Sequence, residues 1–163
     1  MNKPLVRNIL GLFGWLILCF AASFLGAIGS LNAPTFYGQL MQPDWSPPTW
    51  VFGPVWTLLY TLMAIAAWQI WRNGGFKENK LALILFLVQL VLNALWSWIF
   101  FSWQMGGFAF FEIVALAGFI IATILAFYEK SRWASLLLVP YVLWVAFAAF
   151  LNFTLWTMNP EIL

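Results

Sequence analysis

The chain has 163 residues, of which 64% are hydrophobic and 7% are charged, with seven lysines and arginines, five acidic residues and no histidine. Because soluble domains carry about 25% charged residues, this composition excludes a soluble globular domain and a disordered chain, and it indicates an integral membrane protein. The lack of histidine excludes a His-ligated metal or haem site and a His-based catalytic triad, so we expect no metal and no resident cofactor.

Five apolar runs follow one another along the chain, each long enough to cross a bilayer as a helix, which takes about 20 apolar residues. The predicted spans are residues 8–29, 47–71, 81–103, 108–128 and 133–158. The first run is longer than the apolar part of a cleavable signal peptide, so we expect it to be retained as a helix. The sequence therefore predicts an all-α integral membrane protein, a bundle of five transmembrane helices in one domain over residues 1–163.

The connection between the first two predicted spans, residues 30–46, is the longest and contains Tyr37. It ends in Ser46-Pro47-Pro48, which is typical of a helix start. A serine side chain caps free backbone amides, and a proline fits the first helical turn. We therefore expect Ser46 to cap a helix that begins at Pro47.

The basic residues occur in alternate connections, as the positive-inside rule requires for five spans. This pattern predicts a multi-pass protein of a bacterial cell membrane, with a cytoplasmic N-terminus and the C-terminus on the opposite side. Basic residues that are so few and dispersed do not indicate a nucleic-acid partner. The residues are Lys3 and Arg7 before the first span, Arg72, Lys77 and Lys80 between the second and third, and Lys130 and Arg132 between the fourth and fifth.

Three predicted spans carry polar and aromatic side chains along one helical face. In the third span Gln89, Asn93 and Ser97 recur every four residues, with Trp96 beside them. Such side chains either bond a neighbouring helix or meet a ligand, and the sequence leaves both interpretations open. The comparable faces of the second and fifth spans carry Trp56, Tyr60, Tyr141, Trp144, Ala148 and Asn152.

Tryptophan is unusually frequent, with 12 residues in the chain. About seven of them fall at the expected membrane interfaces or in the first connection, where indole rings commonly anchor a helix. The others lie deeper, where each indole N–H needs an acceptor on a neighbouring helix. A cluster of these rings around the polar side chains would instead suit a flat aromatic ligand. The deep residues are Trp15, Trp56, Trp96, Trp98 and Trp144.

Glu112 is the one acidic residue well inside a predicted span. An intramembrane carboxyl group is a candidate functional group, because burying its charge is unfavourable. Glu112 also lies about one turn after Gly106-Gly107, from where its side chain can reach the headgroup region. The sequence leaves its role open.

Three segments resemble the motifs of one family. They read QPDWSPPTWVFGPVWTLLY at residues 42–60, QLVLNALWS at residues 89–97, and VPYVLW at residues 139–144 followed by LNF at residues 151–153. In order and spacing they resemble the tryptophan-rich sensory proteins of the TspO/MBR family, which includes the mitochondrial translocator protein, also called the peripheral benzodiazepine receptor. The resemblance covers nearly the whole chain and favours a bacterial member.

This resemblance implies a five-helix bundle, a homodimer, and a pocket that opens toward the first connection. Family members bind porphyrins such as protoporphyrin IX, and isoquinoline-carboxamide and benzodiazepine drugs. Bacterial members are linked to the regulation of tetrapyrrole metabolism. The residues that match the family's drug pocket are Tyr37, Asn93, Ser97 and Ala148, and those that match positions implicated in light-driven porphyrin breakdown are Trp56 and Trp144.

Cholesterol is not among the ligands that we expect. The cholesterol-recognition stretch of animal members needs a tyrosine followed by a basic residue late in the fifth helix. Here residues 149–156 contain no tyrosine, and no basic residue follows Arg132. Such a motif is weak evidence even where it is present, and its absence leaves cholesterol binding unsupported.

Three functions follow, in order of support. The first is a membrane-embedded protein that binds tetrapyrroles and drug-like aromatic ligands and has a regulatory role. The second is a light-driven porphyrin-degrading enzyme with Trp56 and Trp144 as candidate catalytic residues, since general acid–base groups are scarce. The third is a transporter of porphyrins or other small amphiphiles. The candidate ligand-binding residues are Tyr37, Pro47, Trp56, Tyr60, Gln89, Asn93, Trp96, Ser97, Tyr141, Trp144, Ala148 and Asn152.

Overall fold

Helices are the expected structure of this chain, because no water is available to hydrogen-bond the backbone inside a bilayer. The computed structural model describes residues 3–163, with side chains from residue 5 onward, so the Lys3 side chain lies outside the described part. Every regular element among the described residues is helical. The elements are α1 (Lys3–Gly29), α2 (Ala33–Gln39), the 3₁₀ turn η1 (Thr49–Val51), α3 (Phe52–Trp71), α4 (Gly75–Ser97), the π-helical turn η2 (Trp98–Ser102), α5 (Gly106–Tyr128), α6 (Arg132–Leu137) and α7 (Val139–Met158).

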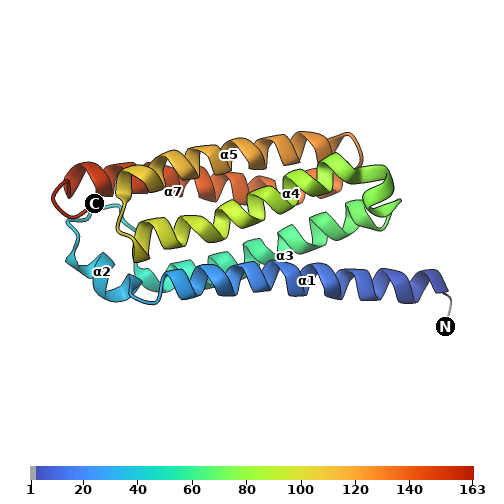
Figure 1. The fold of residues 1–163 in the computed structure, drawn as a ribbon, viewed down its shortest axis with the longest axis horizontal. Coiled ribbons are helices and arrows are strands. Elements are labelled where there is room, and N and C mark those ends of the chain that lie inside the picture. Colours follow the sequence, from blue (N-terminus) through green and yellow to red (C-terminus); the bar gives the residue numbers. More distant parts are fainter. Residues whose placement is uncertain (1–2) are drawn as a thin grey trace.

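The long helices lie side by side in an elongated bundle (Figure 1). Five helical segments are long and apolar enough to cross a membrane, so the predicted all-α fold with five spans is confirmed. The N-terminus and the α3–α4 connection lie at one end, and α2 and the C-terminus lie at the other, called here the α2 end. The first of these is the cationic end, because it carries Arg7, Arg72, Lys77, Lys80, Lys130 and Arg132.

The helices extend beyond the apolar runs that predicted them. α1 begins at Lys3 rather than at residue 8, α4 begins at Gly75 rather than at residue 81, and α5 begins at Gly106 rather than at residue 108. Apolar residues mark the part of a helix that lies in the hydrocarbon, whereas backbone hydrogen bonding continues into polar sequence. Span limits drawn from hydropathy alone were therefore too short at these three starts.

Two of the predicted spans are not single α-helices. The third one ends as the π-helical turn η2, in which the Trp103 amide donates to the Trp98 carbonyl oxygen at 2.8 Å. The fifth one is divided at Leu138 into α6 and α7, and Pro140 lies in the first turn of α7. A proline fits that place because the first-turn amides have no helical acceptor.

The second span begins later than predicted, at the 3₁₀ turn η1 rather than at Pro47. Pro48 precedes this turn, and no side chain caps it. The Ser46 hydroxyl instead contacts the Tyr37 hydroxyl and donates to Gln42 Oε1 at 3.3 Å. The expectation that Ser46 caps this helix was wrong, because the hydroxyl has partners within the first connection.

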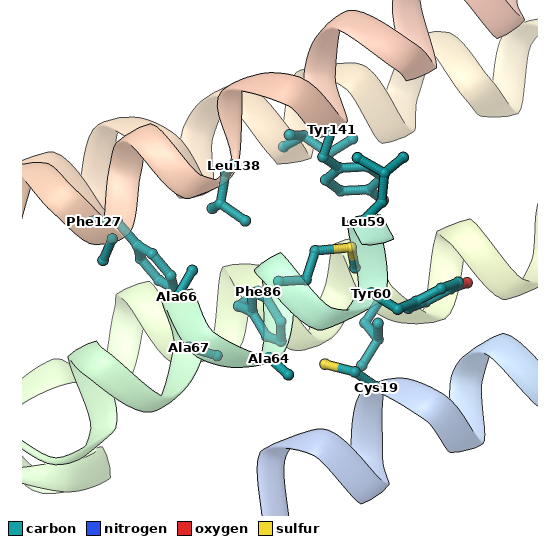
Figure 2. Close-up of a cluster of buried hydrophobic side chains, with 14 of the residues drawn as sticks. Cys19, Leu59, Tyr60, Ala64, Ala66, Ala67, Phe86, Phe127, Leu138 and Tyr141 are labelled. Atoms are coloured by element: carbon teal, nitrogen blue, oxygen red, sulfur yellow. The ribbon is translucent and has the colours of Figure 1, made fainter. Parts of the chain in front are cut away.

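Small residues bring α3 close to its neighbours in the buried core (Figure 2). Ala64, Ala66 and Ala67 of this helix are fully buried. Phe86 of α4 and Phe127 of α5 stack with ring centroids 6.0 Å apart. In membranes, small side chains allow helices to approach and pack closely. The core therefore fixes α3, the helix that carries Trp56 and Tyr60.

The C-terminal segment holds the first connection in place at the α2 end. Asn159 Oδ1 accepts a hydrogen bond from the Met41 amide at 2.8 Å, and its Nδ2 donates to the Met41 carbonyl oxygen at 3.0 Å. Asn159 is itself buried, and its Nδ2 also donates to the Leu155 carbonyl oxygen at 2.8 Å. This clamp positions the segment that follows α2 across one end of the bundle.

Candidate functional site

A cavity of about 430 Å³ lies at the α2 end, between α1, α2, η1, α3, α4 and α7. Its volume falls in the range of small-molecule binding sites. On the α1 side the wall consists of small residues, Ser23, Gly26, Ala27 and Ser30. Aromatic rings from the other elements form much of the remaining wall. The cavity therefore has small side chains on its α1 side, and aromatic rings on which a flat ligand could stack on its other sides.

Eight of the predicted ligand-binding residues line this cavity, and four do not. Pro47 lies before η1, and Gln89, Tyr141 and Asn152 are buried behind the wall. The sequence placed Gln89, Tyr141 and Asn152 on helical faces with residues that line the cavity. Spacing along one helix does not distinguish a residue that lines the cavity from one buried behind it. The residues that line the cavity are Tyr37, Trp56, Tyr60, Asn93, Trp96, Ser97, Trp144 and Ala148.

A buried chain of hydrogen bonds joins α3, α4 and α7 behind the cavity. The Tyr60 hydroxyl donates to Asn93 Oδ1 at 2.5 Å, and Asn93 Nδ2 donates to the Tyr141 hydroxyl at 2.8 Å. The Tyr141 hydroxyl in turn donates to Gln89 Oε1 at 2.8 Å. Bonding between neighbouring helices is therefore observed. Tyr60 and Asn93 also line the cavity, and contact with a ligand there stays a prediction. Gln89 and Tyr141 position Asn93 at the wall.

A second set of hydrogen bonds fixes the indole of Trp96. Its Nε1 donates to Asn152 Oδ1 at 3.1 Å, and Asn152 Nδ2 donates to the Gly106 carbonyl oxygen at 3.0 Å. The Trp96 ring stacks on Phe100 with centroids 5.3 Å apart and planes 14° apart. Asn152 therefore acts as a positioning residue for a ring that lines the cavity.

The indole of Trp144 differs from that of Trp96 in its hydrogen bonding. Its Nε1 is buried and has no hydrogen-bond partner among the described residues. The ring lies edge-on to Phe52 at 5.9 Å and beside Phe147 at 5.5 Å, and it lines the cavity. Buried donors in folded proteins are usually paired. The Trp144 ring thus lines the cavity, while its N–H is covered and unpaired.

Trp56 completes the aromatic wall from α3. Its ring lies 5.7 Å from that of Tyr60 and 6.3 Å from that of Tyr141. The other two deep tryptophans have different surroundings. Trp98 donates through Nε1 to the Leu25 carbonyl oxygen at 3.0 Å, and Trp15 lies toward the cationic end. Depth in the membrane therefore did not by itself identify the tryptophans of the cavity.

The first connection forms one side of the cavity, where Tyr37 of α2 lines the wall. The Tyr37 ring lies edge-on to Phe52 with centroids 6.2 Å apart, and its hydroxyl contacts Ser46. Burial raises the pKa of Tyr37, and the hydrogen bond with Ser46 offsets this in part. The hydroxyl thus stays neutral at physiological pH. Since neither lysine nor arginine lines the cavity, its described wall is uncharged.

Sequence reasoning missed the α1 side of the cavity. Ser23, Gly26, Ala27 and Ser30 recur with helical spacing, and that pattern of small residues was the available signal. A Cβ atom at Gly26 would lie 3.4 Å from the Ser97 hydroxyl oxygen. Glycine at this position therefore allows α1 to approach α4 closely beside the cavity.

Glu112 does not line the cavity. Both of its carboxyl oxygens are buried and have no hydrogen-bond partner among the described residues. No group of three or more histidine, cysteine or acidic residues suited to a metal ion occurs in the described part of the chain. The groups at the cavity wall that could contact a ligand are therefore aromatic rings, amides and hydroxyls.

Comparison with known proteins identifies one family. Residues 15–157 match the TspO/MBR family. The chain is 42% identical to "Tryptophan-rich protein TspO" of Chlorobaculum tepidum, over 98% of this chain and all of that protein. It is 40% identical to "Translocator protein" of Homo sapiens, over 76% of this chain and 75% of that protein. It is 35% identical to "Tryptophan-rich sensory protein" of Cereibacter sphaeroides, over 89% of each.

We expect Asn93→Leu to destabilise the bundle. The change leaves the Tyr60 and Tyr141 hydroxyls without their shared partner. Polar bonds between membrane helices contribute about 0.6 kcal/mol on average and up to about 1.7, so the free energy of unfolding in SDS should fall by roughly 1–3 kcal/mol. Thr61→Val is the control, because the Thr61 hydroxyl bonds only the Thr57 carbonyl oxygen of its own helix. Equal losses in the two variants would contradict the bridging role of Asn93.

Proposed function

This chain belongs to the TspO/MBR family, and from that premise we propose that it binds tetrapyrroles such as protoporphyrin IX in the cavity at the α2 end. Drug-like aromatic molecules of the isoquinoline-carboxamide and benzodiazepine kinds are further proposed ligands. The names of its relatives and its five apolar helices support a sensory or regulatory role in a membrane. The protein would then report the presence of a porphyrin rather than consume it.

The observation that carries this proposal is the uncharged wall of the cavity, where tryptophan rings lie around the Asn93 amide. A flat aromatic ligand stacks on rings and accepts hydrogen bonds through a few polar atoms. Trp56, Trp96 and Trp144 supply the rings, and the amide of Asn93 and the hydroxyl of Ser97 supply neutral polar groups. This wall suits the macrocycle of a porphyrin.

The porphyrin carboxylates would find no cationic clamp in this cavity. The cations whose side chains are described lie at the cationic end, away from α2. By the positive-inside rule we place the cationic end in the cytoplasm of a bacterial cell, so the cavity faces the opposite side of the membrane. The carboxylates would remain in water or meet neutral donors, which predicts modest affinity.

The resemblance also supports a homodimer as the assembled form. The outer face of α5 offers a small residue for a close helix contact, since a Cβ atom at Gly118 would meet no atom within 4 Å. Small residues commonly lie where two membrane helices approach each other. This position is a candidate for the contact between two copies.

A second candidate function is light-driven porphyrin breakdown. One observation favours it, namely that Trp56 and Trp144 line the same cavity. Both rings would then lie against a light-absorbing ligand, where an indole can exchange an electron with it. The first candidate remains preferred because the described wall contains no ionisable acid–base pair for proton transfer.

Replacing Trp144 by phenylalanine should weaken protoporphyrin IX binding about fivefold. The variant keeps an aromatic face but removes the N–H, which we expect to turn toward a bound ligand, and one net hydrogen bond contributes about 1 kcal/mol. Binding is measured on the purified protein by porphyrin absorbance. Trp103→Phe is the matched control, because Trp103 is exposed and lies outside the cavity. Unchanged affinity in Trp144→Phe would contradict a hydrogen bond between this indole and the porphyrin.

Illumination of the same samples separates the two candidate functions. We expect saturable binding with no protein-dependent loss of the porphyrin spectrum, which identifies a binding protein. A loss that requires the folded protein would favour the enzyme. In that case Trp56→Phe and Trp144→Phe should each slow product formation. If product formation survives both changes, these two residues do not carry the reaction.

Neutralising the cationic end should leave porphyrin affinity nearly unchanged. Lys77 and Lys80 lie at the start of α4, remote from the cavity at the α2 end. In a Lys77→Ala, Lys80→Ala double variant we therefore expect the dissociation constant to stay within about twofold of the original in the same titration. A tenfold loss of affinity would show that the carboxylates meet these cations, and the proposed location would be wrong.

A further inference from the structure

A second hollow lies at the cationic end, on the outer side of the bundle. It has a volume of about 490 Å³ and lies between α1, the end of α3 and α4. It shares no residue with the cavity at the α2 end. Trp15 and Trp71 lie in its floor, and Arg7 lies at its outer end. We call it the α1 groove.

Two glycines of α1 line this groove. A Cβ atom at Gly11 would collide with the ring of Trp71, so the indole occupies the space of the missing side chain. At Gly14, one turn deeper, a Cβ atom would meet no atom within 4 Å. The groove is therefore open along α1 between the level of Trp71 and that of Leu18.

The walls of the groove are apolar and face the bilayer. Leu10 is 65% exposed, Leu18 is 40% exposed and Phe76 is 43% exposed. Trp15 and Phe76 stack with ring centroids 6.4 Å apart. From Arg7 to Leu18 the helix rises about 16 Å at 1.5 Å per residue, which is about half the thickness of the hydrocarbon core. The groove therefore extends along α1 for about the thickness of one leaflet.

The end of the groove is polar and positive. Among the described residues the Arg7 guanidinium has one hydrogen-bond acceptor, the Arg72 carbonyl oxygen, 3.4 Å from Nη2. A guanidinium has five N–H donors, so most of them remain free for another partner. This end of the bundle carries six described cations against two carboxylates, Glu78 and Glu129. A negatively charged group is therefore the complementary partner of Arg7.

We propose that the α1 groove binds an anionic diacyl phospholipid of the leaflet at the cationic end. One acyl chain lies along Gly11, Gly14 and Leu18, and the phosphate lies against Arg7. Guanidinium groups bind phosphate oxygens in pairs of hydrogen bonds, and basic pockets between transmembrane helices are known sites for anionic headgroups. This site does not depend on which ligand occupies the cavity at the α2 end.

The charge of the site is tested with Arg7→Gln and a matched control, Arg132→Gln. Arg132 lies at the same end but outside the groove, with its guanidinium 5.5 Å from the centre of the Tyr128 ring. The purified, delipidated protein is given equal amounts of phosphatidylglycerol and phosphatidylcholine with the same acyl chains, and bound lipid is counted by native mass spectrometry. The original protein should retain phosphatidylglycerol preferentially. Arg7→Gln should lose about fivefold in that preference, and Arg132→Gln should keep it.

The shape of the site is tested with Gly14→Leu against Gly38→Leu. Both glycines have open space where the side chain would go, so neither change disturbs the core. Gly14→Leu should fill the groove and lose the bound phosphatidylglycerol, while Gly38→Leu, which lies outside the groove, should retain it. Thermal melting of all variants checks that they remain folded.

Three results would overturn the proposal. Equal losses in Arg7→Gln and Arg132→Gln would mean that the lipid senses only the general charge of this end. Retention of lipid by Gly14→Leu would mean that the groove holds no acyl chain. Displacement of the lipid by millimolar inorganic phosphate would mean that a free anion, rather than a phospholipid, is the occupant.

Discussion

The hydrogen-bonded chain from Tyr60 through Asn93 and Tyr141 to Gln89 is the interaction on which the rest of the structure depends. Inside a bilayer water cannot satisfy a polar group, so a polar side chain is stabilised where it finds a partner within the protein. These four side chains do so by linking α3, α4 and α7, although Gln89 Nε2 stays unpaired. The same bonds hold the Asn93 and Tyr60 side chains at the cavity wall, so the requirement for internal partners also shapes the site.

The same requirement distinguishes the tryptophans from one another. Trp68, Trp96 and Trp98 each donate to an acceptor on another helix, which ties their rings to the bundle. Trp144 is buried without an acceptor, although its ring is packed against Phe52 and Phe147. A buried donor left unpaired in this way is energetically unfavourable. Hydrogen-bond satisfaction, rather than depth, therefore distinguishes Trp144 from Trp68, Trp96 and Trp98.

Much of the fold could be predicted from the sequence, because apolar runs and alternating basic connections follow directly from the physics of a bilayer. Only part of the candidate site could be predicted from the sequence. Helical spacing placed Asn93 and Ser97 on one face, but it could not show that Gln89 lies behind that face. Ser46 was misassigned, because its partner Tyr37 is nine residues away and is brought near only by the short helix α2. The glycines of α1 were overlooked, since hydropathy gives no weight to a missing side chain.

Those glycines make α1 the helix that shapes both hollows. Near the α2 end Gly26 lets α1 approach Ser97 and Ala94 beside the cavity. Near the cationic end Gly11 gives its space to the Trp71 ring, and Gly14 leaves the groove open toward the lipid. The same helix therefore uses missing side chains in two ways. Gly26 allows close packing against α4 beside the cavity, and Gly14 leaves open space on the face toward the lipid.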